Sequence, residues 1–185
     1  VLNTSIPLYL YYTCQKITGF DDCYGTDCIT ETYTCEHIRM KNLTTTTYNF
    51  TVSERDNFTA WQNTSYMAEF DNKNPPTEMM YNTTTSSGKL YGVHMKLTFN
   101  EPDTYNCSVF TVTYLYGDQR LVLRKASMYI RGSLPTNTTP EVYCEADFFT
   151  YCYNTTIYKP YNSSCTVYED TCEDEREQTN EHTGQ

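Results

Sequence analysis

Cysteine occurs nine times in this sequence, at positions 14, 23, 28, 35, 107, 144, 152, 165 and 172. These cysteines form no C-x-x-C pair and no cluster with histidine, so we expect no zinc site and assign no metal ligand. Disulfide bonds are the expected role, and they place the chain in an oxidising compartment. Because the count is odd, at least one thiol should be free or bonded to another molecule.

Glycosylation signals indicate the same compartment. The sequence contains ten N-x-S/T sequons, at Asn3, Asn42, Asn49, Asn57, Asn63, Asn82, Asn106, Asn137, Asn154 and Asn162. Together with the cysteines they predict a secreted, extracellular glycoprotein. No apolar run approaches the roughly 18 residues that a membrane span needs, and no signal peptide stands at the start. We therefore expect a mature, processed form without a membrane span.

Charge separates the chain into a body and a tail. The net charge of −10 argues against nucleic acid as a partner, because phosphate binding needs a basic face. Many of the acids lie in residues 166–185, which lack apolar periodicity. The predicted organisation is one domain over residues 1–165 and an acidic, flexible tail over residues 166–185.

Tyrosine and threonine dominate the body and suit half-buried strands, so the composition indicates an all-β fold. Strand-like runs separated by turn residues occupy residues 7–18, 28–40, 44–53, 58–71, 77–84, 89–99, 105–116 and 120–131. Eight sequential strands with short turns predict an antiparallel up-and-down barrel, which removes exposed sheet edges.

A helix should follow the last strand. Thr139-Pro140-Glu141 is a typical helix start, with threonine as the cap and proline at the first helical position. Val142, Ala146, Phe149 and Tyr153 then recur at helical spacing. We expect this C-terminal helix to pack on the outside of the barrel through that face.

The sequons also predict which side chains point inward, because a glycosylated asparagine must point outward and neighbours alternate along a strand. Outward Asn49, Asn63 and Asn82, with the apolar face of residues 89–99, give this predicted lining: Tyr48, Phe50, Tyr66, Phe70, Met79, Tyr81, Tyr91 and Met95. Barrels of eight strands are either packed solid or hold one small ligand, and both remain open at this point.

Barrel, helix and cysteine placement together resemble the tick salivary lipocalins of the histamine-binding type. In that family a cysteine opens the seventh strand, others lie in an aromatic-rich helix, and a last one follows a short strand. Here YNCSVFTVTY, VYCEADFFTYC and IYKPYNSSC occupy those places, and GTDCIT matches the strand-two cysteine. The resemblance implies the bridges Cys107–Cys144 and Cys28–Cys165. Cys14 and Cys35 flank the first turn and are candidates for a third bridge.

Amine-binding members of this family carry Cys-Asp-hydrophobic, then up to 17 residues, then Glu-Leu-Trp or Glu-Leu-Tyr. This sequence keeps the frame as Cys107-Ser108-Val109 and Ser127-Met128-Tyr129, so serine replaces both acids. The loss disfavours amine binding by that route, because a buried ammonium needs a paired anion.

The same resemblance turns Ser108, Phe110 and Val112 toward the cavity, and Ser127 and Tyr129 of the second half of the frame are also predicted ligand-binding residues. Asn106 shares the alternation of Ser108 yet should face outward, and we expect it at the barrel rim, before regular alternation begins. If it lies within the strand, Val109 and Thr111 line the cavity instead.

These features predict a binding protein and not an enzyme. No nucleophile, base and orienting group stand in a recognisable motif, and no cofactor is expected. The leading hypothesis is sequestration of a small hydrophobic or amphipathic host molecule, most of all an eicosanoid, fatty acid or sterol, which would suppress host inflammation or immunity.

Two alternatives remain. One is a scavenger of a biogenic amine, histamine or serotonin. Its carboxylate would be Glu31, because Glu69 and Glu78 share the alternation of the outward Asn63 and Asn82. The other is an immunomodulator that binds a host protein partner through its surface.

Overall fold

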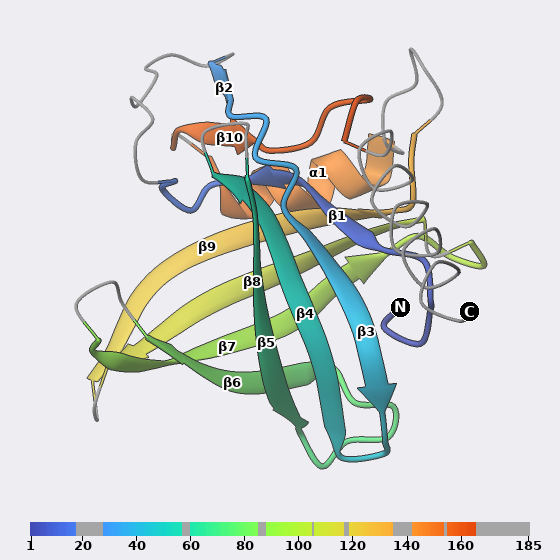
Figure 1. The fold of residues 1–185 in the computed structure, drawn as a ribbon, viewed down its shortest axis with the longest axis vertical. Helices are drawn as coiled ribbons and strands as arrows, with labels where there is room; N and C mark the ends of the chain where they lie inside the picture. The colour runs from blue at the N-terminus through green and yellow to red at the C-terminus, as the bar shows by residue number, and fades with distance from the viewer. Residues whose placement is uncertain are drawn as a thin grey trace, which may run out of the picture.

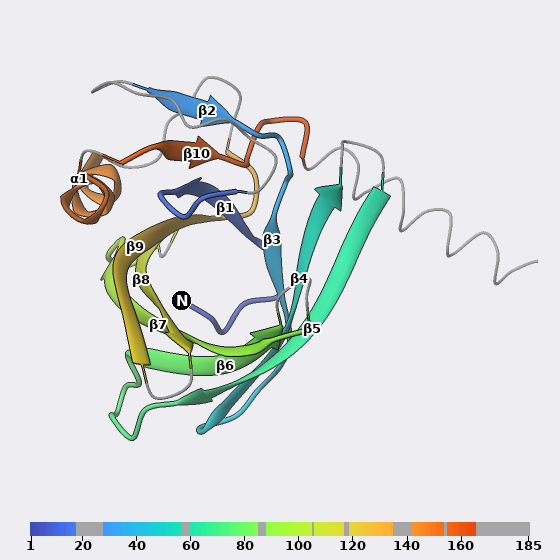
Figure 2. The ribbon, with the colours of Figure 1, turned by 90° about the vertical axis from the view of Figure 1, so that its left-hand side faces the viewer.

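The computed structural model describes residues 1–17, 28–56, 60–84, 88–104, 106–116, 119–134, 142–153 and 155–165. Eight antiparallel strands form the barrel: β1 (Leu8–Thr13), β3 (His37–Leu43), β4 (Thr47–Asp56), β5 (Ala60–Phe70), β6 (Glu78–Thr84), β7 (Leu90–Asn100), β8 (Cys107–Tyr116) and β9 (Gln119–Arg131). They are neighbours in that order, and β9 returns to pair with β1 (Figures 1 and 2). The predicted eight-stranded barrel is confirmed. The predicted tail, Cys23, Cys172 and the sequons at Asn57, Asn137 and Asn154 lie outside the described residues.

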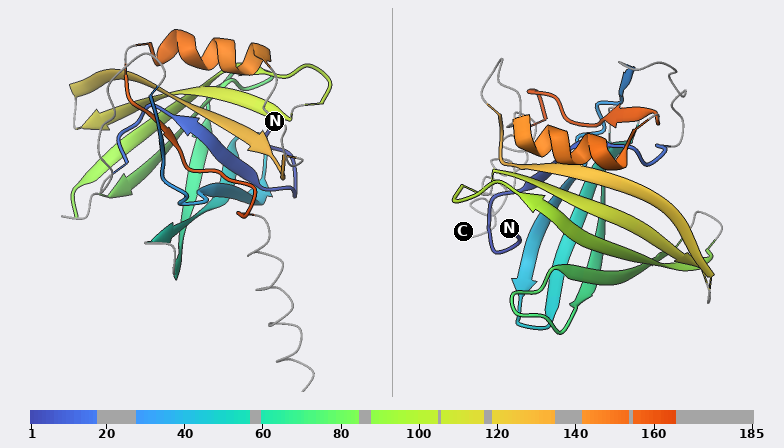
Figure 3. Two further views of the ribbon diagram at one scale, coloured as in Figure 1. Left: turned by 90° about the horizontal axis from the view of Figure 1, so that it is seen from above. Right: turned by 180° about the vertical axis from the view of Figure 1, so that it is seen from behind.

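Three further elements lie on one side of the barrel: β2 (Ile29–Glu31), α1 (Val142–Tyr151) and β10 (Ile157–Lys159) (Figure 2). The predicted strand over residues 28–40 is therefore two strands. β2 leaves the barrel to run parallel to β10, and β3 begins only at His37. The α1 helix packs on the wall made by β7, β8 and β9 (Figure 3). No helix in the described parts of the chain is long and apolar enough to cross a membrane.

Strand alternation divides the apolar residues into two cores. Inward residues such as Leu10, Phe50 and Val93 fill the barrel. Outward residues of β1, β8 and β9, among them Tyr9 and Met128, pack beneath α1 and β10. β1 is buried on both faces, as its continuous run LYLYY would require.

All three disulfides between described residues lie in this outer core. Cys107 is bonded to Cys144, as the resemblance implies. Cys165 is bonded to Cys35 and not to Cys28, so the implied Cys28–Cys165 bridge is wrong. The cause is local: the Cys35 amide donates to the Pro160 carbonyl oxygen at 3.1 Å, which brings Cys35 to the chain just before Cys165.

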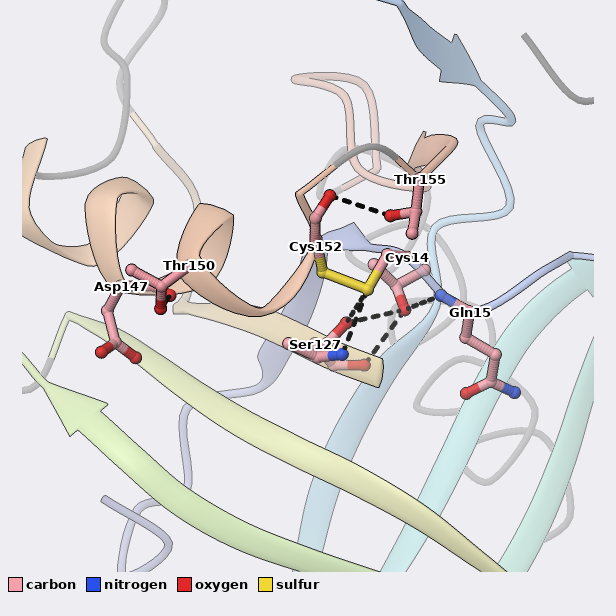
Figure 4. The surroundings of a disulfide bond; sticks show 9 residues. Cys14, Gln15, Ser127, Asp147, Thr150, Cys152 and Thr155 are labelled. Carbon is pink, nitrogen blue, oxygen red and sulfur yellow. Dashed lines mark hydrogen bonds between the residues drawn. A yellow bond between two sulfur atoms is a disulfide. The ribbon is translucent and has the colours of Figure 1, made fainter. Parts of the chain in front are cut away.

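The third bridge joins Cys14 at the end of β1 to Cys152 just after α1, which also overturns the Cys14–Cys35 pairing (Figure 4). Cys14 and Cys35 do not meet, because β1 pairs with β3 only at Leu8 and Tyr9, whereas its other end pairs with β10 at Thr13. The Ala126 amide donates to Cys14 Sγ at 3.2 Å, so the bridge also contacts β9. Cys28 is itself disulfide-bonded, to a residue other than Cys165.

The buried face of α1 differs from the prediction. Cys144, Phe148 and Cys152 recur every fourth residue, and all three are buried. Ala146, Phe149 and Tyr153 of the predicted face are exposed instead. Two disulfides fix the cysteine-bearing side against the barrel, and this constraint overrides the apolar spacing. Thr98 on β7 adds a hydrogen bond from its hydroxyl to Asp147 at 2.8 Å.

Phe148 and Phe149 provide a matched test of this helix orientation. Phe148 is 0% exposed and Phe149 is 41% exposed. Phe148→Ala should lower the free energy of unfolding by about 3–5 kcal/mol, because it leaves a cavity in the outer core. Phe149→Ala should cost about 1 kcal/mol or less. Urea denaturation of both variants measures the difference, and equal losses would contradict the orientation of α1.

Candidate ligand-binding cavities of the barrel

Two cavities of the barrel interior are lined by residues that the structure describes. We call the first the tyrosine chamber; its wall includes Tyr66, Tyr81, Tyr91, Tyr114 and Tyr129 with Glu36 and Glu54, and its volume is about 180 Å³. We call the second the apolar cavity; its wall includes Leu2, Leu43, Phe70, Met79, Leu97 and Phe110, and its volume is about 830 Å³.

The cavities lie toward opposite ends of the barrel. Glu54 of the tyrosine chamber stands near the end of β4, whereas the apolar cavity includes Thr46, just before β4 begins. Met95 on β7 lines both. The N-terminal segment enters the ring of strands in the view along the barrel, where Leu2 contributes to the apolar cavity (Figure 2).

The predicted lining residues all belong to the barrel interior, but they divide between three places. Tyr66, Tyr81, Tyr91, Met95, Ser127 and Tyr129 line the tyrosine chamber, and Phe70, Met79, Met95 and Phe110 line the apolar cavity. Tyr48, Phe50 and Ser108 are buried and border neither cavity. Whether any of the twelve contacts a ligand stays a prediction.

Strands β8 and β9, which are the seventh and eighth strands of the barrel, have the orientation that the resemblance implied. Phe110 and Tyr129 pack in the barrel interior, whereas Val109 packs in the outer core. Asn106 is exposed and stands just before β8 begins, as expected for a rim position. Ser127 shares a hydrogen bond with Thr13 at 3.2 Å, and the Ser108 hydroxyl is buried with no partner among the described residues.

The sequon positions on β4, β5 and β6 also agree with the predicted alternation. Asn63 and Asn82 are exposed and Asn49 is partly buried. The residues of opposite alternation on the same strands, Tyr48, Phe50, Tyr66 and Tyr81, all pack in the interior core. Whether these asparagines carry glycans stays a prediction.

Glu36 is the residue that sequence reasoning missed. It is half-buried and lines the tyrosine chamber. Burial raises the pKa of the Glu36 carboxyl to about 7, and the negative charge of Glu54 adds to the shift. Burial also raises the pKa of Tyr81 and Tyr129, with a contribution from the Glu36 charge, so their hydroxyls stay protonated.

A β-bulge explains why strand alternation did not predict that Glu36 points inward. Counting back from outward Asn42 places residue 36 outward. The ladder between β3 and β4 shifts between Met40 and Asn42, and this irregularity reverses the faces, so Ile38 and Glu36 point inward. Glu54 could have been predicted to point inward, because it shares the strand alternation of the inward Phe50.

Glu31, the carboxylate expected to point inward, does not reach either cavity. It lies on β2 outside the barrel, where its carboxylate is 3.5 Å from Lys159 Nζ and accepts a hydrogen bond from Tyr33. The expectation failed because β2 is not a barrel strand.

Strands, interior and outer helix define a lipocalin fold with internal cavities. No family model matches the chain, and no curated protein matches it. Thirteen chains of solved structures do match. One of them is japanin from Rhipicephalus appendiculatus bound to cholesterol, a tick protein with a TM-score of 0.52 and 11% identity; the match covers 89% of this chain and 97% of that one. At this identity the likeness shows the shared fold alone.

The raised pKa of Glu36 predicts how stability depends on pH. Between about 4.5 and 7 the folded state holds a proton that the unfolded state has lost, so stability falls as pH rises through this interval. Glu36→Gln removes the ionisation cost. Relative to wild type it should gain up to about 3 kcal/mol at pH 8 and less than about 1 kcal/mol near pH 5. Urea unfolding of both proteins at the two pH values measures this, and a pH-independent difference would show that Glu36 titrates normally.

Proposed function

We propose that this protein is a secreted binding protein that sequesters a small host lipid, an eicosanoid, fatty acid or sterol, in its apolar cavity and so suppresses host inflammation or immunity. The observation that carries the proposal is the cavity itself. Its volume of about 830 Å³ falls within the roughly 300–1,000 Å³ of typical ligand pockets, and aromatic, thioether and aliphatic side chains form much of its wall.

The chemistry of this wall suits an amphipathic molecule. Phe70, Met79 and Phe110 offer apolar surface, and burying ligand area against it contributes roughly 25 cal/mol per Å². Asp71 and Lys73 stand in the same wall, with Lys73 Nζ 3.1 Å from the Asp71 carboxylate. An apolar body with one polar group therefore matches the cavity, and japanin with its cholesterol provides a precedent for a sterol in this fold.

Lipid binding can be tested by filling the cavity. Leu97→Trp adds bulk to its wall and should reduce the affinity for leukotriene B4 or cholesterol at least about tenfold, since the ligand loses its space. Leu90→Trp adds the same side chain on the exposed side of the same strand and should leave affinity unchanged. Calorimetric titration of wild type and both variants decides the matter. Failure of wild type to bind any of these lipids, or equal binding by Leu97→Trp, would refute the proposal.

A biogenic amine in the tyrosine chamber is the second candidate, and Glu36 favours it. Glu36 and Glu54 line this chamber together with five tyrosines. A bound ammonium would stabilise the charged form of Glu36 and offset the burial that raises its pKa. Aromatic faces add cation–π attraction. The route differs from the family motif, whose two acids are serines here.

Substitutions of Glu36 and Glu31 distinguish an amine site in the tyrosine chamber from non-specific charge attraction. If histamine or serotonin binds, Glu36→Gln should weaken binding about tenfold to a hundredfold, because a charged hydrogen bond is lost. Glu31→Gln removes the same charge outside the barrel and should have no effect. Calorimetric titration in one buffer gives both values. Equal effects of the two substitutions would exclude the tyrosine chamber as the amine site.

A further inference from the structure

The wall of the barrel is incomplete between two strands. β5 pairs with β4 at every residue from Ala60 to Glu69. It pairs with β6 at only two positions, Glu69 with Met80 and Phe70 with Met79. The two strands meet at one end and then diverge (Figure 1). Residues 60–68 of β5 and residues 81–84 of β6 therefore have a strand neighbour on one side only, among the described residues, and we call them the open edges.

Side chains and not the backbone join β5 to β6 along the gap. The hydroxyls of Tyr66 and Thr83 share a hydrogen bond at 3.2 Å, and the rings of Tyr66 and Tyr81 lie 5.0 Å apart. These side chains point into the barrel and line the tyrosine chamber.

Exposed edges are a hazard, because their unpaired amides and carbonyls can add a strand from another molecule. Soluble proteins usually protect such edges with lysine, other charges or proline. Residues 60–68 and 81–84 contain no charged residue and no proline. The β5 edge also exposes Met67, which is 60% accessible. The open edges thus lack the common protection.

Each open edge carries one sequon instead. Asn63 lies within residues 60–68 and Asn82 within residues 81–84, and both side chains are exposed. A strand added to either edge would lie about 4.8 Å from it, so a glycan on the edge strand would collide with the body of the incoming molecule. Asn49 provides the contrast, since it has strand neighbours on both sides, Asn42 and Met67.

We propose that N-linked glycans on Asn63 and Asn82 protect the open edges of β5 and β6 from pairing with the β5 edge of a second copy of this chain. A second copy is the occupant because two identical uncharged β5 edges can pair antiparallel about a twofold axis, which satisfies both at once. This role is independent of the ligand, so it stands or falls separately from the proposed function.

The double variant Asn63→Gln/Asn82→Gln tests the proposal. Light scattering over a concentration series should show wild type as a monomer and the variant doubling in mass as concentration rises. Amides of residues 60–68 should gain protection from hydrogen exchange in the dimer. Asn49→Gln, which removes one glycan from a fully paired strand, should remain monomeric.

A second variant separates edge protection from a general effect of glycan loss. Asn63→Lys/Asn82→Lys also lacks both glycans but places a charge on each edge, so it should remain monomeric. If the glutamine variant is not secreted, trimming the glycans of folded wild type to the first sugar should produce the same dimer. Unoccupied Asn63 and Asn82 in the wild-type protein, or a monomeric glutamine variant or trimmed protein, would overturn the proposal.

Discussion

The structure depends on the pairing of β1 with β9. These strands are more than a hundred residues apart in the sequence, yet Leu8 to Thr13 lie against Ser127 to Arg131 and close the ring. The pairing buries β1 on both faces, so one short strand belongs to the barrel interior and to the outer core at once. The Cys14–Cys152 bridge and the bond between Thr13 and Ser127 hold it at one end. Leu10 and Thr13 of β1 and Ser127 and Tyr129 of β9 line the tyrosine chamber, so loss of this seam would open that chamber.

Strand alternation and the positions of the sequons were sufficient to predict most of the barrel. Alternation placed Tyr66, Tyr81 and their neighbours inward, because β4 to β7 run without interruption over those residues and the sequons give their direction. It failed at Glu36, where a bulge in β3 reverses the faces, and alternation contains no signal for a bulge. The buried carboxylate was therefore the part of the site that could not be predicted.

The disulfide pairing and the buried face of α1 were harder to predict for a different reason. Cys28 and Cys35 are seven residues apart in one strand-like run, and the choice between them depends on where β2 leaves the barrel, which is decided by tertiary pairing with β10. In α1, the stripe of Cys144, Phe148 and Cys152 competes with an equally regular apolar stripe. Only the bridges decide which stripe is buried, and bridges join residues distant in sequence.

The three described bridges all lie in the outer core, and none of their cysteines lines either cavity. The elements that fix the shape of the molecule are thus separate from the surface that would meet a ligand. Cavity-lining residues can be exchanged over generations without removing a cross-link. A protein with this arrangement can change its ligand quickly during evolution while its fold is retained.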